Sequence, residues 1–142
     1  MAALYRIPTL ADGHCLLHAV RTSWEDEMNM APPSLQEMKC KIFEESVCYI
    51  SRYLPFCPSY TKLTYLKDMS KYLLQKHYDS PYGDLVPMMI SNSFRIKLNI
   101  MNNEGGNINQ IQVSPVSPSN DLKTISIFRD HDHFSGARKI TM

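Results

Sequence analysis

The chain has 142 residues, of which 44% are hydrophobic and 20% charged, and its formal net charge at pH 7 is +1. This length suits one domain, residues 1–142, with one hydrophobic core. A charge so close to zero gives no electrostatic attraction to nucleic acid or to an anionic membrane. No apolar run is long enough to span a bilayer, and the first residues lack a signal-peptide pattern. We expect a monomer that binds neither.

The cysteine count bears on the cellular compartment. Four cysteines are enough for two disulfides, but nothing in the sequence indicates secretion, so reduced thiols in a cytoplasmic protein are the expected state; the four are Cys15, Cys40, Cys48 and Cys57.

The first half of the chain predicts an edge strand followed by helices. Residues 4–7 alternate and are stopped by Pro8, and a helix runs from Cys15 to about Trp24. A capping-box sequence at Ser34 opens a helix that reaches about Tyr53, with an apolar stripe of Leu35, Met38, Ile42 and Tyr49. A further helix runs from Thr61 to about His77, with an apolar face of Leu63, Leu66, Met69 and Leu73.

The second half predicts one helix and then strands. Asp84 is the expected N-cap of a helix over 85–94, with Pro87 tolerated in its first turn. Alternating segments predict strands at 96–101, 108–113, 125–129 and 134–140, the first two joined by a hairpin turn at 103–107. This order indicates an α+β fold, a small mixed or antiparallel sheet packed between helices.

The most informative stretch is Asp12-Gly13-His14-Cys15, because a turn dipeptide there precedes a run of helix-forming residues. Cys15 then lies in the first turn of a helix, where the helix dipole and free N–H groups lower the pKa of a thiol. The same N–H groups, from Cys15 and from the turn, can stabilise the oxyanion that forms when a thiolate attacks a carbonyl. The alternative is a buried core cysteine.

A second stretch decides between these interpretations. A late alternating segment runs into Asp130-His131-Asp132-His133-Phe134, which ends in a His-aromatic pair. An Asp-Gly-X-Cys-Leu motif with Ala19 four residues after the cysteine, followed much later by such a pair, resembles the ovarian-tumour (OTU) family of cysteine deubiquitinases.

The resemblance implies a papain-like cysteine protease arrangement in which Cys15 is the nucleophile and His133 the general base. Asp12 belongs to the family's active-site set, and we interpret it as shaping the turn. The implied activity is hydrolysis of isopeptide bonds after the C-terminal glycine of ubiquitin, with ubiquitin or polyubiquitin as partner, no cofactor and no metal. The implied location is the cytoplasm, meaning the host cytosol for a viral or bacterial protein.

The chain departs from the family pattern at two positions. Ser135 stands where an Asp or Asn usually orients the histidine, so the orienting acid is missing or comes from Asp12, Asp130 or Asp132. His14 replaces a common asparagine. A Ser135→Asp variant is expected to keep equal or higher activity.

Three alternatives stay open from sequence alone. His131 competes with His133 as the base, whereas His18 and His77 are interpreted as structural. A catalytically weak or inactive ubiquitin-binding module fits the serine at position 135. A zinc site made by His14, Cys15, His131 and His133 is the third, although paired Cys-X-X-Cys spacing is missing.

Overall fold

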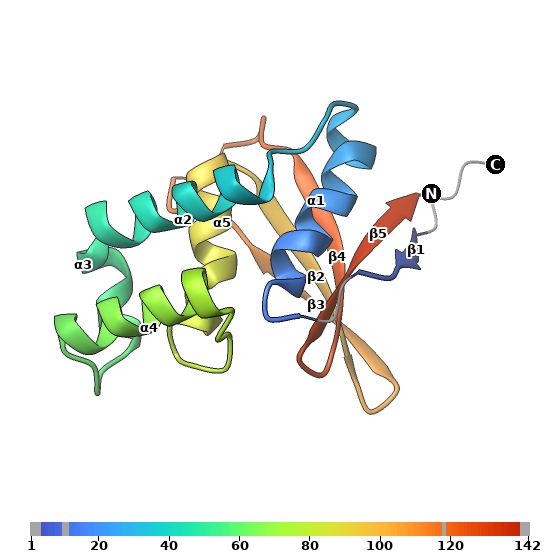
Figure 1. The fold of residues 1–142 in the computed structure, drawn as a ribbon. Helices are drawn as coiled ribbons and strands as arrows, with labels where there is room; N and C mark the ends of the chain where they lie inside the picture. The colour runs from blue at the N-terminus through green and yellow to red at the C-terminus, as the bar shows by residue number, and fades with distance from the viewer. Residues whose placement is uncertain (1–3, 10–11, 118, 140–142) are drawn as a thin grey trace.

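The computed structural model describes residues 4–9, 12–117 and 119–139 and has an α+β architecture (Figure 1). Ile140, to which the last predicted strand extends, lies outside the described residues. Five strands form one sheet with the order β1-β5-β4-β2-β3, and the strands are β1 (Leu4–Ile7), β2 (Lys97–Glu104), β3 (Asn107–Val113), β4 (Thr124–Asp130) and β5 (His133–Lys139). The α+β prediction is confirmed.

The sheet is mixed, and its central pair is parallel. β2 and β4 run parallel, whereas β1–β5, β4–β5 and β2–β3 are antiparallel. The predicted strands therefore exist, with ends that differ by at most three residues, and β1 is the predicted edge strand. Strands are recovered well because alternation with a period of two is specific to a half-buried strand.

The helices precede β2 in the chain: α1 (Cys15–Met28), α2 (Leu35–Cys48), α3 (Ile50–Tyr53), α4 (Lys62–Gln75) and α5 (Val86–Phe94), with short 3-10 turns η1 (Leu54–Phe56) and η2 (Gly83–Leu85). α1 continues past Trp24 to an Asn29 cap in the left-handed conformation. The predicted capping box at Ser34 is confirmed. The helix expected to begin at Thr61 does begin there, with the Thr61 hydroxyl accepting from the Thr64 N–H as its N-cap. None of the helices in the described ranges is long and apolar enough to cross a bilayer.

Three details of the helix prediction are wrong. The helix that was expected to reach Tyr53 breaks at Tyr49, whose side chain is exposed rather than in the apolar stripe. Leu63, expected in the core, is also exposed. Asp84 is not an N-cap, because residues 83–85 form η2 and α5 begins only at Val86, with Pro87 in its first turn as expected.

Tyrosines join the side chains that the sequence pattern placed in the core, of which Met38, Ile42, Met69 and Leu73 are buried as predicted. Tyr53, Tyr65, Tyr72 and Tyr82 are among the largest fully buried side chains. Three of their hydroxyls reach hydrogen-bond partners inside the core: Tyr53 donates to Glu45, Tyr65 to the Ser46 carbonyl, and Tyr82 pairs with the Ser46 hydroxyl. A tyrosine is tolerated in a core when its hydroxyl is paired in this way.

Helix α1 connects the helical part to the sheet (Figure 1). It packs on β4 and β5, where a Cβ on Gly136 would lie 2.6 Å from the Thr22 side chain, so the glycine permits the close approach. The Ala137 N–H donates to the Ser23 hydroxyl at 2.8 Å. These contacts hold the middle of α1 against the middle of β5, and thereby position the helix that begins at Cys15.

Candidate active site

Cys15 is the first residue of α1, and the turn before it is closed by hydrogen bonds to Asp12. The carboxylate Oδ1 of Asp12 accepts from the His14 N–H at 2.9 Å, and its main-chain carbonyl accepts from the Cys15 N–H at 3.1 Å. Asp12 therefore shapes the turn, as interpreted from the sequence. Two of the N–H groups expected to stabilise an oxyanion are instead engaged within the turn in this conformation.

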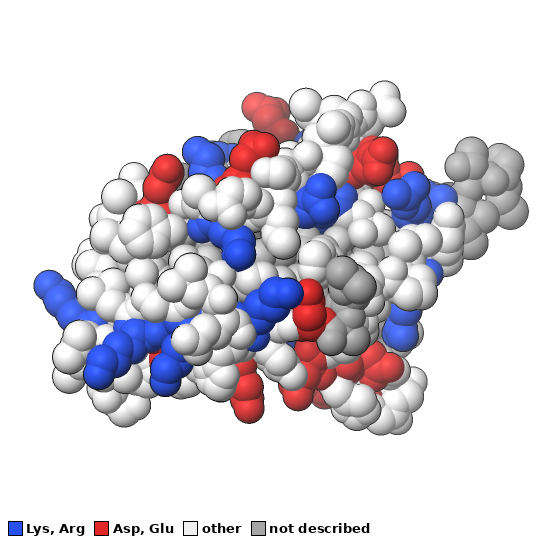
Figure 2. Space-filling model, in the orientation of Figure 1, with Lys and Arg blue, Asp and Glu red and all other residues white. Residues whose placement is uncertain are grey.

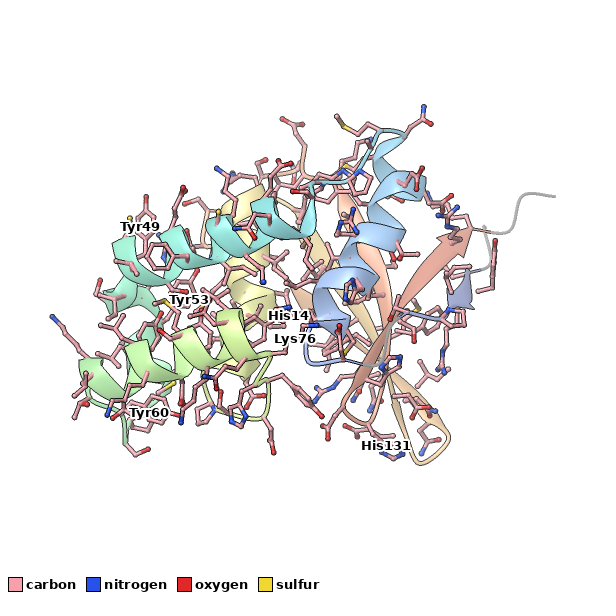
Figure 3. The ribbon with its side chains drawn as sticks, viewed as in Figure 1. His14, Tyr49, Tyr53, Tyr60, Lys76 and His131 are labelled. Carbon is pink, nitrogen blue, oxygen red and sulfur yellow. The ribbon has the colours of Figure 1, made fainter. Side chains whose placement is uncertain are left out.

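The turn is also held against the C-terminal end of α4 (Figure 3). A Cβ on Gly13 would lie 1.7 Å from the Lys76 carbonyl oxygen, so only glycine fits there. The Lys76 ammonium lies 3.2 Å from the second carboxylate oxygen of Asp12, and His18 lies 3.4 Å from the same oxygen. These contacts, the backbone H-bond to His14 and the nearby charges together lower the pKa of Asp12, although burial acts in the opposite direction.

His14 makes the third link to α4. Its imidazole is fully buried, and Nε2 donates to the Tyr72 carbonyl at 2.8 Å. Nδ1 is buried without a hydrogen-bond partner among the described residues. Burial lowers the pKa of His14, because a charged imidazolium would lose its hydration there. His14, which stands where the family often has asparagine, is therefore a neutral histidine that holds the turn against α4.

The structure brings Cys15 to the start of β5, as the sequence predicted. The Phe134 N–H donates to Cys15 Sγ at 3.4 Å, and the thiol lies 3.9 Å from the Asp132 carbonyl oxygen. Asp132 and Phe134 are the residues directly before and after His133. The backbone of His133 therefore lies beside the sulfur. Cys15 and His133 line the same cavity. Among the described residues, no hydrogen bond joins the imidazole to Sγ.

The predicted lowering of the Cys15 pKa is wrong for this conformation. The side chain is almost fully buried, and burial raises the pKa of the thiol above its usual value although the Phe134 N–H bond acts in the opposite direction. Desolvation penalises a thiolate more than one main-chain donor stabilises it. Sequence spacing located the helix N-terminus but did not give the depth at which it is buried.

His131 and His133 are now distinguishable. His131 lies in the turn between β4 and β5 with a positive φ of 57°, and its side chain is 88% exposed (Figure 3). His133 is half-buried and opens β5, next to the groups that touch the sulfur. This placement favours His133 as the base. Ser135 is buried, and within the described ranges its hydroxyl makes no hydrogen bond to His133.

Two cavities meet at Cys15. The larger, of about 440 Å³, extends between the loop after α4, α5 and strands β2 and β3; its lining includes Asp79, Asp84, Met88, Ile100, Ile111 and Val113. The smaller, of about 350 Å³, lies between the turn at Asp12 and the β4–β5 turn, and His131 and His133 line it. The lining residues of the larger cavity were not predicted as part of a site, because they come from separate segments with no motif of their own.

The zinc alternative finds no support here. Within the described ranges, no group of three or more His, Cys, Asp or Glu side chains is placed to hold a metal ion. His14 is turned away to the Tyr72 carbonyl, which removes it from the set that the zinc interpretation needs. All four cysteines are free thiols.

Comparison with known proteins gives matches in structure alone. No family model and no curated protein matches the sequence. A Wolbachia pipientis OTU deubiquitinase bound to ubiquitin is 12% identical, with a TM-score of 0.65 over 96% of both chains. The OTU domain protease of Taggert virus is 13% identical, with a TM-score of 0.70 over 100% of this chain and 86% of its own. That of Qalyub virus is 14% identical, with a TM-score of 0.59 over 98% of this chain and 91% of its own. The chain therefore has the fold of the OTU deubiquitinase domains.

Proposed function

We propose that this protein is a cysteine deubiquitinase that hydrolyses isopeptide bonds after the C-terminal glycine of ubiquitin. The observation that carries the proposal is the position of the Cys15 sulfur against the backbone on both sides of His133. A thiol and an imidazole on one cavity wall form the minimal set for nucleophilic attack on an amide. Structural neighbours that are OTU deubiquitinase domains, two of them bound to ubiquitin, support ubiquitin as the substrate class.

The reaction divides between these two side chains. His133 takes the thiol proton, and Sγ attacks the isopeptide carbonyl carbon to give a tetrahedral oxyanion. The imidazolium then donates its proton to the departing lysine amine, and the C–N bond breaks to leave a thioester on Cys15. A water molecule, deprotonated by His133, attacks the thioester and releases the ubiquitin carboxylate and the free thiol.

Two features of the resting site change when substrate binds. Cys15 starts as a protonated thiol whose sulfur contacts the Asp132 carbonyl and the Phe134 N–H and not His133, so the hydrogen bond from Sγ to His133 forms only in the complex, as catalytic hydrogen bonds often do. The Cys15 N–H exchanges its bond to the Asp12 carbonyl for one to the oxyanion. An oxyanion donor of this kind typically changes turnover by a factor of ~10²–10³.

The larger cavity suits the extended C-terminal tail of ubiquitin. It leads from Cys15 along β2 and β3, where Ile111 and Val113 present an apolar wall, and two carboxylates line the opposite side. β3 is the edge strand of the sheet and is mostly exposed, so its outer face is open to an extended peptide. A tail that ends in two glycines brings no side chain against Gly13 and Cys15, which line the cavity at that end.

The direct test is reaction with ubiquitin whose C-terminus carries a thiol-reactive group. We expect a covalent adduct of one ubiquitin per chain, mapped to Cys15 by mass spectrometry. Cys15→Ala abolishes the adduct and the cleavage of diubiquitin, whereas Cys40→Ser, which removes an exposed thiol, leaves both intact. A folded wild-type protein that forms no adduct on Cys15 refutes the catalytic proposal.

A second candidate is a ubiquitin-binding module with weak or no activity. The raised pKa of Cys15 and the serine at position 135 favour it, because both reduce the supply of thiolate and the stabilisation of imidazolium. Calorimetric binding of ubiquitin to wild-type protein without adduct formation or cleavage is the outcome that supports this alternative. Binding of similar strength by wild type and Cys15→Ala, together with cleavage by wild type alone, supports the enzyme.

A further inference from the structure

The two cavities beside Cys15 are not equivalent for the reaction. Both are lined by Gly13, Cys15, Tyr78 and Asp132, so the nucleophile lies where they meet. A carbonyl carbon bonded to Sγ carries its acyl chain on one side and its amine on the other. The group that protonates the leaving amine must therefore lie on the amine side.

The histidines identify that side. His131 and His133 line the smaller cavity and are absent from the lining of the larger one. We infer that the smaller cavity, hereafter the acceptor cavity, binds the part of the substrate that leaves with the amine, and that it takes a modified lysine flanked by basic residues. This inference rests on the proposed function and names a substrate class for it.

The charge of the acceptor cavity carries the second half of the inference. Asp12, Asp130 and Asp132 line it, and its lining contains no Lys or Arg. Acidic side chains are visible on the lower edge of the molecule, where Figure 1 places the β4–β5 turn (Figure 2). The leaving amine becomes an ammonium ion once it is protonated, so carboxylates there stabilise both the product and any neighbouring basic side chain.

The three carboxylates differ in their availability. Asp12 is committed to the turn and to Lys76 at 3.2 Å. Asp130 lies 3.8 Å from Arg6 and 3.8 Å from the His131 ring. Asp132 lies 4.0 Å from Arg129, and its side chain is 76% exposed. Exposed pairs of this length contribute little and exchange partners readily. Asp130 and Asp132 are therefore the groups that a basic acceptor segment engages.

Tyr78 lies at the boundary between the acceptor cavity and the larger cavity. It lines both, and it lies in the loop after α4, where a Cβ on Gly83 would come within 2.0 Å of its carbonyl oxygen. The close approach of Gly83 fixes the backbone at this point. The residue at the boundary of the two cavities therefore has a main chain that is held in place.

The test compares acceptors that differ in charge alone. Ubiquitin is joined through an isopeptide bond to the central lysine of a synthetic peptide that carries either two Arg or two Glu beside that lysine. We expect wild-type protein to have about a fivefold higher kcat/KM for the Arg peptide at low salt, because each exposed charge contact is worth a factor of roughly 1.5 to 5. The preference falls as NaCl is added.

Variants then assign the preference to residues. The Asp130→Asn/Asp132→Asn double variant should reduce the ratio of the two rates below twofold, and the ratio cancels any uniform change in catalysis. Asp121→Asn, in the exposed loop at the other end of β4, is the matched control and should keep the wild-type ratio. Circular dichroism confirms that each variant is folded.

Failure of the inference is distinguishable from failure of the proposed function. Ubiquitin with a small aminocoumarin leaving group reports cleavage without an acceptor. The acceptor assignment is overturned if the protein cleaves the aminocoumarin substrate but cleaves the Arg and Glu peptides at equal rates. It is also overturned if the double variant leaves the ratio of the Arg-peptide rate to the Glu-peptide rate unchanged. In both cases the proposed deubiquitinase activity is retained. A folded wild-type protein that cleaves none of the three substrates overturns both.

Discussion

Lowering the pH from 7.5 to 5.5 is expected to destabilise this protein through His14. The native imidazole is fully buried, donates from Nε2 to the Tyr72 carbonyl, and has no acceptor for a second proton within the described ranges. Burial lowers its pKa, so the unfolded chain binds a proton that the native protein rejects. The stability from neutral His14 is complete above the unfolded pKa of about 6.5 and is lost as the pH falls through that value toward the lower native pKa.

The size of the effect follows from proton linkage. If native His14 binds no proton over this range, the free energy of unfolding falls by about 1.4 kcal/mol between pH 7.5 and 5.5. His14→Phe keeps a ring in the same space and cannot be protonated. It also loses the hydrogen bond to Tyr72, a cost of about 1 kcal/mol that is the same at both pH values and cancels in the comparison.

The assay is urea denaturation of wild type and His14→Phe at both pH values. The wild type should lose up to about 1.4 kcal/mol more stability than the variant on acidification. Other titrating groups are common to both proteins and drop out of the difference. An equal pH dependence in the two proteins would refute the reasoning, because His14 would then titrate alike in the native and unfolded states.

Three further changes test the nucleophile and its surroundings. Gly13→Ala places a Cβ against the main-chain carbonyl of Lys76 at the end of α4 and should lower the free energy of unfolding by at least about 2 kcal/mol. Gly105→Ala, at a left-handed turn position with open space around it, should lower it by about 1 kcal/mol. Equal losses of stability for the two variants in chemical denaturation contradict the steric argument. In a background with the exposed cysteines replaced by serine, alkylation of Cys15 should rise steadily between pH 7 and 9, because burial raises the pKa of the thiol, and a plateau in that range contradicts this. Ser135→Asp should lower the melting temperature, since the site is buried, yet keep equal or higher turnover; a folded variant with a large loss of turnover contradicts the placement of His133 as base.

Local sequence signals predicted the local structure. The capping box at Ser34 and the alternation in the strands gave α2 and the sheet because the interactions concerned lie within a few residues of each other. The motif at Asp12 to Cys15 gave the turn and the helix start for the same reason. The pairing of Cys15 with the start of β5 came from the resemblance and not from any local pattern.

Burial was the property that the sequence did not predict. On α4 the sequence pattern placed Leu63 in the core, whereas Tyr65 and Tyr72 are buried and Leu63 is exposed. The Tyr65 hydroxyl donates to the Ser46 carbonyl, a partner that is distant in the sequence and that no local pattern indicates. The predicted direction of the Cys15 pKa shift was wrong because it, too, depends on burial. A helix N-terminus favours a thiolate in solvent, but the packing of β5 over it decides how much solvent remains.

The contacts that place the sulfur are mostly made by main-chain atoms. The carbonyl of Asp132, the N–H of Phe134 and the carbonyl of Lys76 are available whatever side chains stand there. Side-chain identity matters only where no main-chain group can substitute: the Asp12 carboxylate that caps the turn, and the missing Cβ of Gly13. Those two residues and the cysteine itself are the defined positions of the Asp-Gly-X-Cys motif, whereas His14, which holds the turn through its side chain, stands at the undefined position of the motif.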